Sequence, residues 1–166
     1  MTNYQTLIEK ESKVMARLHQ QIHETVKNRD KDLKSWKSAC REFHTYCSPI
    51  DPMINRVYED KIIADKELQE FVITFLELDP MFFRSGYIKE EMLKKIKKSP
   101  ISIKQKDRLR LVLKDAVENR GTREFKKYCN LAIELANAEF ISYLNVVSSY
   151  GEGTRKSRAK LMLKYV

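Results

Sequence analysis

The chain has 166 residues and a formal net charge of +9, with 42% hydrophobic and 33% charged residues. The apolar share excludes a disordered chain, and only four Gly and four Pro leave little material for the turns of an all-β fold. No apolar run approaches the roughly 18 residues that a membrane span requires. Because the start is polar and the three cysteines lack a disulfide spacing, we expect one soluble domain, residues 1–166, in the reducing cytoplasm.

Residues 1–48 predict an antiparallel helical hairpin. Apolar residues recur every three or four positions in a first helix from about Asn3 to Asn28 and again in a second helix. The second helix places five residues on one face, namely Leu33, Trp36, Cys40, Phe43 and Cys47. The polar stretch between the two helices is short, which brings them side by side.

Residues 51–149 predict further packed helical pairs, and residues 154–166 predict a basic C-terminal helix opened by Thr154. Helix starts are indicated by the capping residues Asp51, Asp65, Ser102 and Thr122. Helix ends are indicated by Asp79-Pro80, Ser99-Pro100 and a left-handed cap at Gly121. The apolar pattern after Thr122 predicts one long helix to about Ser149. The sequence therefore predicts an all-α fold of about seven helices.

An internal overlay appears when the chain is shifted by 41 residues. In the first helix of each pair, the matches are Leu68 with Leu109, Phe71 with Val112, Val72 with Leu113, Phe75 with Ala116 and Leu76 with Val117. In the second helix they are Tyr87 with Tyr128, Ile88 with Cys129 and Met92 with Ile133. The overlay resembles the HEAT repeat in period and apolar positions. The alternative is that any two amphipathic hairpins align in this way.

The net charge is unevenly distributed. Residues 1–83 carry 12 Lys and Arg against 14 Asp and Glu, whereas residues 84–166 carry 20 against 9. A basic face of this kind attracts acidic partners in a salt-dependent way. The alternative is a solvated surface that keeps the protein soluble.

We expect the partner-binding site in the basic C-terminal half, on both sides of Ser99-Pro100. Its residues are Lys94, Lys95, Lys97, Lys98, Lys104, Lys106, Arg108 and Arg110, with Arg123, Lys126 and Lys127 alongside. Cations near a helix start are mildly unfavourable, so the residues from Lys104 to Arg110 suggest a use beyond local stability. Reversing Lys104, Lys106 and Arg108 to Glu is expected to keep the fold and abolish binding.

The chemical side chains favour no catalytic or metal site. His19, His23, Cys40, His44 and Cys47 have the residue types of a zinc site, but Cys40 and Cys47 already belong to the apolar face. Cys40 with His44 is the one local nucleophile–base candidate, but such same-face neighbours are common on helices and no helix N-terminus or loop exposes the thiol. The aromatic group Phe82, Phe83 and Tyr87 is expected in the core. We therefore expect no enzyme activity, no metal, no cofactor and no small-molecule substrate.

Two function classes remain open from the sequence. The first is a helical interaction module of the adaptor, inhibitor or immunity type that binds an acidic protein. The second is a sequence-independent nucleic-acid binder, since lysine supplies charge to phosphates without bidentate reading of bases. A subunit of an enzyme whose chemistry lies in another chain is a weaker third class.

Overall fold

The computed structural model describes residues 3–121 and 123–166. Within these residues the chain forms nine α-helices, one short 3-10 helix and no strand, which confirms the all-α prediction but not the number of about seven. None of the helices in these ranges has both the length and the apolar character that a bilayer span needs. The helices are α1 (Tyr4–Val26), α2 (Leu33–Thr45), α3 (Asp51–Tyr58), α4 (Lys66–Leu78), α5 (Ser85–Ile96), α6 (Ile103–Asn119), α7 (Phe125–Leu135), α8 (Ala138–Tyr150) and α9 (Gly153–Leu163), with the 3-10 helix η1 (Lys61–Ile63) before α4.

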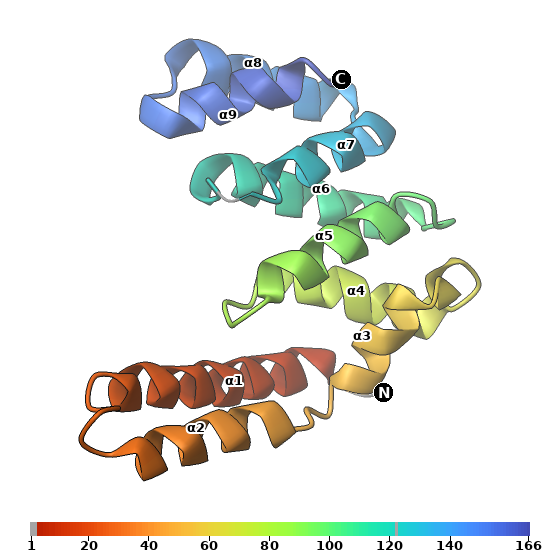
Figure 1. Ribbon diagram of the computed structural model, residues 1–166. Helices are drawn as coiled ribbons and strands as arrows, with labels where there is room; N and C mark the ends of the chain where they lie inside the picture. Colours follow the sequence, from red (N-terminus) through yellow and green to blue (C-terminus); the bar gives the residue numbers. More distant parts are fainter. Residues whose placement is uncertain (1–2, 122) are drawn as a thin grey trace.

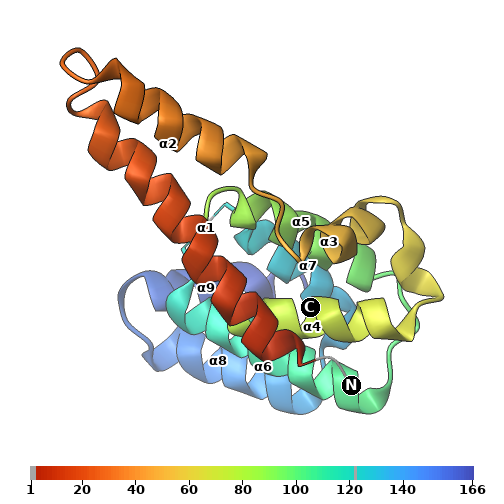
Figure 2. The same cartoon turned by 90° about the horizontal axis from the view of Figure 1, so that it is seen from below.

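The hairpin of α1 and α2, which we call the arm, projects from the rest of the molecule (Figure 2). The first half of α1 packs on α4, and the rings of Tyr4 and Phe71 meet edge to face at 5.4 Å. At the base of the arm, the buried carboxylate of Glu11 accepts hydrogen bonds from Tyr46 Oη (2.5 Å) and Ser48 Oγ (2.9 Å). The far half of the arm packs mainly on itself.

After α3, which packs on α4 and α5, the helices stack as successive pairs, α4–α5, α6–α7 and α8–α9 (Figure 1). Helix α4 lies beside α6, and α5 lies beside α7. Helix α8 is tied to α6 through the Tyr143 hydroxyl, which donates to Glu118 (2.5 Å). One hydrophobic core runs through the stack, from Ile8 of α1 to Met162 of α9.

The 41-residue overlay holds for the first helix of each pair and fails for the second. Leu68 and Leu109 are both fully buried, as a shift of 41 requires. In the second helices, Met92 is buried whereas Ile133, its expected match, is 47% exposed. A shift of 39 instead matches the buried Met92, Leu93 and Ile96 with the buried Leu131, Ala132 and Leu135. Helix α7 also begins one residue earlier than a shift of 41 requires, because the connection spans residues 79–84 in the first pair but only 120–124 in the second.

The long helix expected from Thr122 to Ser149 is two helices. Helix α7 ends at Leu135, and Asn137 caps α8 by accepting a hydrogen bond from the Phe140 backbone N–H (2.9 Å). The guanidinium of Arg110 donates to the Leu135 carbonyl (2.6 Å) and so satisfies an acceptor that the break exposes. No Gly or Pro marks this break, which is why the apolar pattern alone ran through it.

Several helix ends differ from their predicted positions. Asp65 and Ser102 cap α4 and α6 as predicted, and Ser102 forms the capping box with Gln105. Asp51 is the first residue of α3 and not its cap, and α6 ends on an extended Arg120 and not on a left-handed glycine. Two further ends differ: Glu152 precedes α9, which starts one residue before Thr154, and Cys47 lies beyond α2 and is exposed. Thr122 lies outside the described residues.

The cap of α8 supplies a test of the corrected break. Replacing Asn137 by Ala removes the side-chain acceptor and is expected to lower the free energy of unfolding by about 1 kcal/mol. Asn137→Asp retains an acceptor at the same place and is expected to unfold near the wild-type urea midpoint. Equal midpoints for wild type and Asn137→Ala would contradict the assigned break.

Candidate interaction surface

The structure divides the predicted basic site into two groups at opposite ends of α6. Lys104 and Lys106 lie in the first turns of α6, and the connection 120–124 follows its last residue. Seventeen helical residues span about 25 Å at 1.5 Å per residue. Lys126 and Lys127, in the first turn of α7, therefore lie far from the Lys104 end. The two groups do not form one continuous patch.

Three of the predicted residues are engaged within the fold. Lys95 is buried and ion-paired with Asp60, which holds the pKa of that carboxyl below its usual range. Arg108 donates from Nε and Nη2 to both carboxylate oxygens of Glu77 (2.6 Å each) and from Nη1 to Glu70 (2.5 Å). These hydrogen bonds raise the pKa of Arg108 and join α6 to α4.

Arg110 is the third engaged residue, since it pairs with Asp107 and also donates to the Leu135 carbonyl that ends α7. At the other end of α6, Arg123 is exposed. Its Nε donates to Glu90 (2.9 Å), and its guanidinium lies over the Tyr87 ring at 4.0 Å.

Five of the other predicted lysines lie on either side of the turn between α5 and α6, and we call this group the lysine corner. It consists of Lys94, Lys97, Lys98, Lys104 and Lys106. Lys94 and Lys97 are loosely paired, at 3.6 Å from Glu91 and 3.7 Å from Glu134. Lys98, Lys104 and Lys106 form no ion pair with any residue in the described ranges.

The lysine corner contains an exposed apolar residue at the start of α6, and Lys104 lines a hollow beside it. Ile103, the first residue of α6, is 79% exposed and stands next to Lys104. A hollow of about 690 Å³ lies against the corner and opens toward α4. Its lining includes Lys66, Gln69, Pro100, Ile101, Lys104 and Gln105. The corner therefore combines three lysines without an ion pair in the described chain, an exposed apolar side chain and a concave wall.

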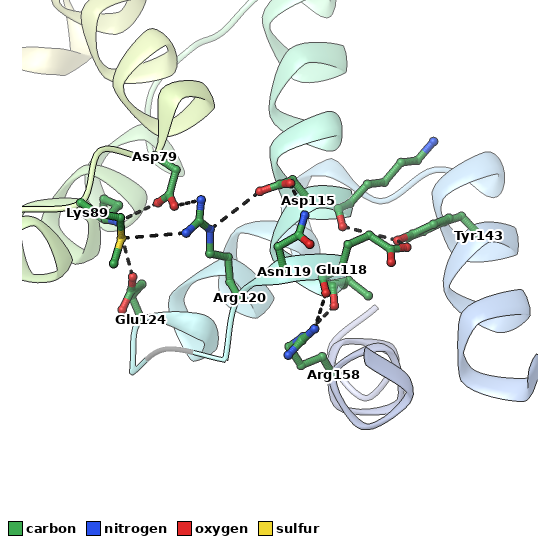
Figure 3. A network of polar contacts seen from close by, with 12 residues as sticks. Asp79, Lys89, Asp115, Glu118, Asn119, Arg120, Glu124, Tyr143 and Arg158 are labelled. Carbon is green, nitrogen blue, oxygen red and sulfur yellow. Dashed lines mark hydrogen bonds and ion pairs between the residues drawn. The ribbon is translucent and has the colours of Figure 1, made fainter. Parts of the chain in front are cut away.

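A buried charge group that the sequence analysis did not identify lies between the pairs α4–α5 and α6–α7, at the opposite end of α6 from the lysine corner (Figure 3). Lys89 is 1% exposed, and its Nζ lies 2.7 Å from Asp79 Oδ1 and 3.8 Å from Glu124 Oε1. The second oxygen of Asp79 is paired with Arg120, whose Nε lies 3.8 Å from Asp115. Burial lowers the pKa of the Lys89 ammonium, and the Glu124 carboxylate opposes that shift. We call Asp79, Lys89, Arg120 and Glu124 the buried charge group.

The buried charge group favours a structural role over chemistry. A lysine base or nucleophile needs access to a substrate, and Lys89 is enclosed by two carboxylates that balance its charge. The sequence contained a signal, because Lys89 precedes the buried Met92 and Ile96 by three and seven residues and so shares their helix face. The charge count included Lys89 among the 20 basic residues of 84–166 without separating it from the solvated ones.

The histidines and cysteines of the arm lie near the junction with the body. His19 stacks on Phe83 at a ring-centroid distance of 4.8 Å and on the His23 edge at 4.6 Å. Cys40 is half-buried and His44 is exposed on α2. The described part of the chain holds no group of three His, Cys, Asp or Glu side chains arranged to bind a metal. In the body, burial raises the pKa of the Cys129 thiol to about 11.

Of the three aromatic residues expected in the core, one packs against it and two are exposed. Phe82 is partly buried and packs against the core. Phe83 and Tyr87 are 45% and 54% exposed. Phe83 contacts His19 of the arm, and Tyr87 lies under the guanidinium of Arg123. These two rings serve contacts between elements rather than core packing.

Comparison with protein-family models, with curated proteins and with solved structures finds no match to this chain.

The buried charge group predicts a large stability effect. Lys89→Met leaves the buried Glu124 without its cation and Asp79 with Arg120 alone, and it is expected to cost about 3–5 kcal/mol. Lys114→Met removes an ammonium 2.8 Å from the exposed Glu139 and is expected to cost about 1 kcal/mol or less. Denaturant unfolding of both variants measures the difference.

Adding Glu124→Gln to Lys89→Met removes the carboxylate that has lost its cation and should recover part of the loss, while Asp79 stays paired with Arg120. A Lys89→Met variant as stable as Lys114→Met would show that the buried charge group does not hold the stack together.

Proposed function

We propose that this protein is a non-enzymatic helical interaction module of the adaptor, inhibitor or immunity type that binds an acidic protein through the lysine corner. The observation that carries the proposal is the contrast between the basic residues. The arginines of α6 are engaged by carboxylates and carbonyls, whereas Lys98, Lys104 and Lys106 have no ion-pair partner in the described chain. Cations without an intramolecular ion pair are available to a partner.

The position of Lys104 and Lys106 strengthens this reading. Both lie at the start of α6, where the helix dipole disfavours cations. Arg108 and Arg110 lie in the same half of α6, but their contacts with carboxylates and with the Leu135 carbonyl account for their positive charge. Of the basic residues from Lys104 to Arg110, the two lysines are left without an ion pair in the described chain.

A protein partner is favoured over a phosphate backbone at this corner by its apolar content. Protein interfaces combine an apolar centre with a polar rim. Ile103 supplies a large exposed apolar side chain beside the lysines, and the hollow lined by Pro100 and Ile101 offers a concave surface. An acidic helix or loop with one apolar anchor has the complementary chemistry.

The proposal extends to architecture and location. The side-by-side placement of α4 with α6 and of α5 with α7 is consistent with HEAT-like units, in which one face of the stack carries the binding surface. We place the protein in the cytoplasm as one domain of residues 1–166, without catalysis of its own.

The test reverses Lys104 and Lys106 to Glu and retains Arg108, because reversing Arg108 would also break its bonds to Glu70 and Glu77. With fluorescent poly-L-glutamate as the acidic probe, the double variant is expected to bind about tenfold or more weakly, a change of about 1.4 kcal/mol. Circular dichroism and the urea midpoint check that the fold is unchanged.

The matched control is Lys126→Glu with Lys127→Glu. These two lysines also lie in a first helical turn without an ion-pair partner among the described residues, and they change the net charge equally. The control is expected to bind the probe nearly as the parent does. Equal loss in both double variants would mean that net charge alone governs binding, and unchanged binding in both would remove the lysine corner from the account.

A further inference from the structure

We propose that the outer face of α2 binds the phosphate backbone of double-stranded nucleic acid. The face consists of Lys34, Lys37 and Arg41, and we call it the arm stripe. This surface lies on the arm and not at the lysine corner, so the inference goes beyond the proposed function and does not depend on it.

Helical spacing places the arm stripe opposite the packed face of α2. Ala39 is buried and Phe43 is half-buried, which marks the side that faces the rest of the molecule. Lys34, Lys37 and Arg41 follow one another at three and four residues and fall on the opposite side. All three are exposed. The helix that carries them belongs to the arm, which projects from the body (Figure 2).

The arm stripe is cationic without internal compensation. None of its three side chains forms an ion pair with a residue in the described parts of the chain. They line a shallow hollow of about 450 Å³ together with Leu33 and Ser38, and no carboxylate takes part. The nearby Asp32 is engaged as the cap of α2, accepting from Ser35 N–H (3.1 Å) and Ser35 Oγ (2.6 Å).

The spacing and chemistry of the stripe fit phosphates. From Lys34 to Arg41 the helix rises about 10 Å, and one strand of a duplex presents a phosphate about every 3.4 Å along its axis. Three cations therefore face about three phosphates of one strand. Cations and a serine hydroxyl are the groups that contact phosphate oxygens, and they carry no base-specific reading.

An acidic protein fits the stripe less well than it fits the lysine corner. The apolar component of the hollow is Leu33, at the end of the helix next to the turn, and the rest of the lining is polar. Protein interfaces are enriched in aromatic and apolar residues at their centre and depleted in lysine. A surface without such a centre gains its affinity from charge, which is how proteins bind a nucleic-acid backbone.

The experiment compares full-length wild type with Lys34→Gln/Lys37→Gln/Arg41→Gln. Binding to a fluorescent 20-base-pair duplex of mixed sequence is followed by anisotropy across a salt series. Loss of three phosphate contacts is expected to weaken binding at least about tenfold and to reduce the log–log salt slope by about 2.7, at 0.9 for each phosphate. A second duplex of different sequence should give the same affinities.

The matched control is Lys126→Gln/Lys127→Gln/Lys160→Gln. It removes three body lysines, two exposed and Lys127 half-buried, that have no ion pair in residues 3–121 and 123–166. It is expected to retain duplex affinity and slope within about twofold, since these lysines lie outside the arm stripe. Equal loss in the control, or unchanged duplex binding in the arm variant, overturns the proposal. It is also overturned if the arm variant loses poly-L-glutamate binding as strongly as duplex binding, because the stripe would then serve an acidic protein. The variant Lys104→Glu/Lys106→Glu is expected to retain duplex binding, which separates the arm stripe from the lysine corner.

Discussion

An ammonium held out of water has to be matched by carboxylates, and Lys89 is the residue on which this requirement falls most heavily. Its two acidic neighbours come from different places, Asp79 at the end of α4 and Glu124 immediately before α7. Arg120, just after α6, balances the second oxygen of Asp79. Four chain segments therefore have to meet at one point, which fixes how the pair α4–α5 sits on the pair α6–α7.

Arginines extend the same principle along the stack. Arg108 crosses from α6 to α4, Arg110 closes the end of α7, and Arg158 of α9 donates to the carbonyls of Val117 (2.6 Å) and Glu118 (2.5 Å) near the end of α6. The planar guanidinium suits these sites because it donates to several acceptors in a fixed geometry. Much of the excess positive charge of residues 84–166 is consequently internal cross-linking, and the charge available to a partner is carried mainly by lysines. We have proposed an acidic protein for one lysine group and a duplex backbone for the stripe on the arm.

Local patterns predicted the local structure. The apolar periodicity identified the hairpin, and the caps at Asp65 and Ser102 are where the sequence placed them. The break at Asn137 was missed because a single capping asparagine within an unbroken apolar pattern competes with helix continuation. The role of Lys89 was missed because composition does not separate a buried lysine from a solvated one. Dividing the chain at residue 83 also hid the arm, since residues 1–48 carry 9 basic against 6 acidic residues while residues 49–83 carry 3 against 8. Which cations lie together depends on contacts between distant segments, and sequence spacing does not report those.

The account rests on a division between basic residues that hold the fold and lysines that remain available to a partner. Acetylation of lysines by a water-soluble reagent, read residue by residue by mass spectrometry, measures that division directly. The account predicts that Lys89 and Lys95 stay unmodified in the folded protein, that Lys98, Lys104 and Lys106 react readily, and that poly-L-glutamate protects those three but not Lys126 or Lys127. Rapid modification of Lys89 in the folded protein, or uniform protection of all exposed lysines by the probe, would contradict it.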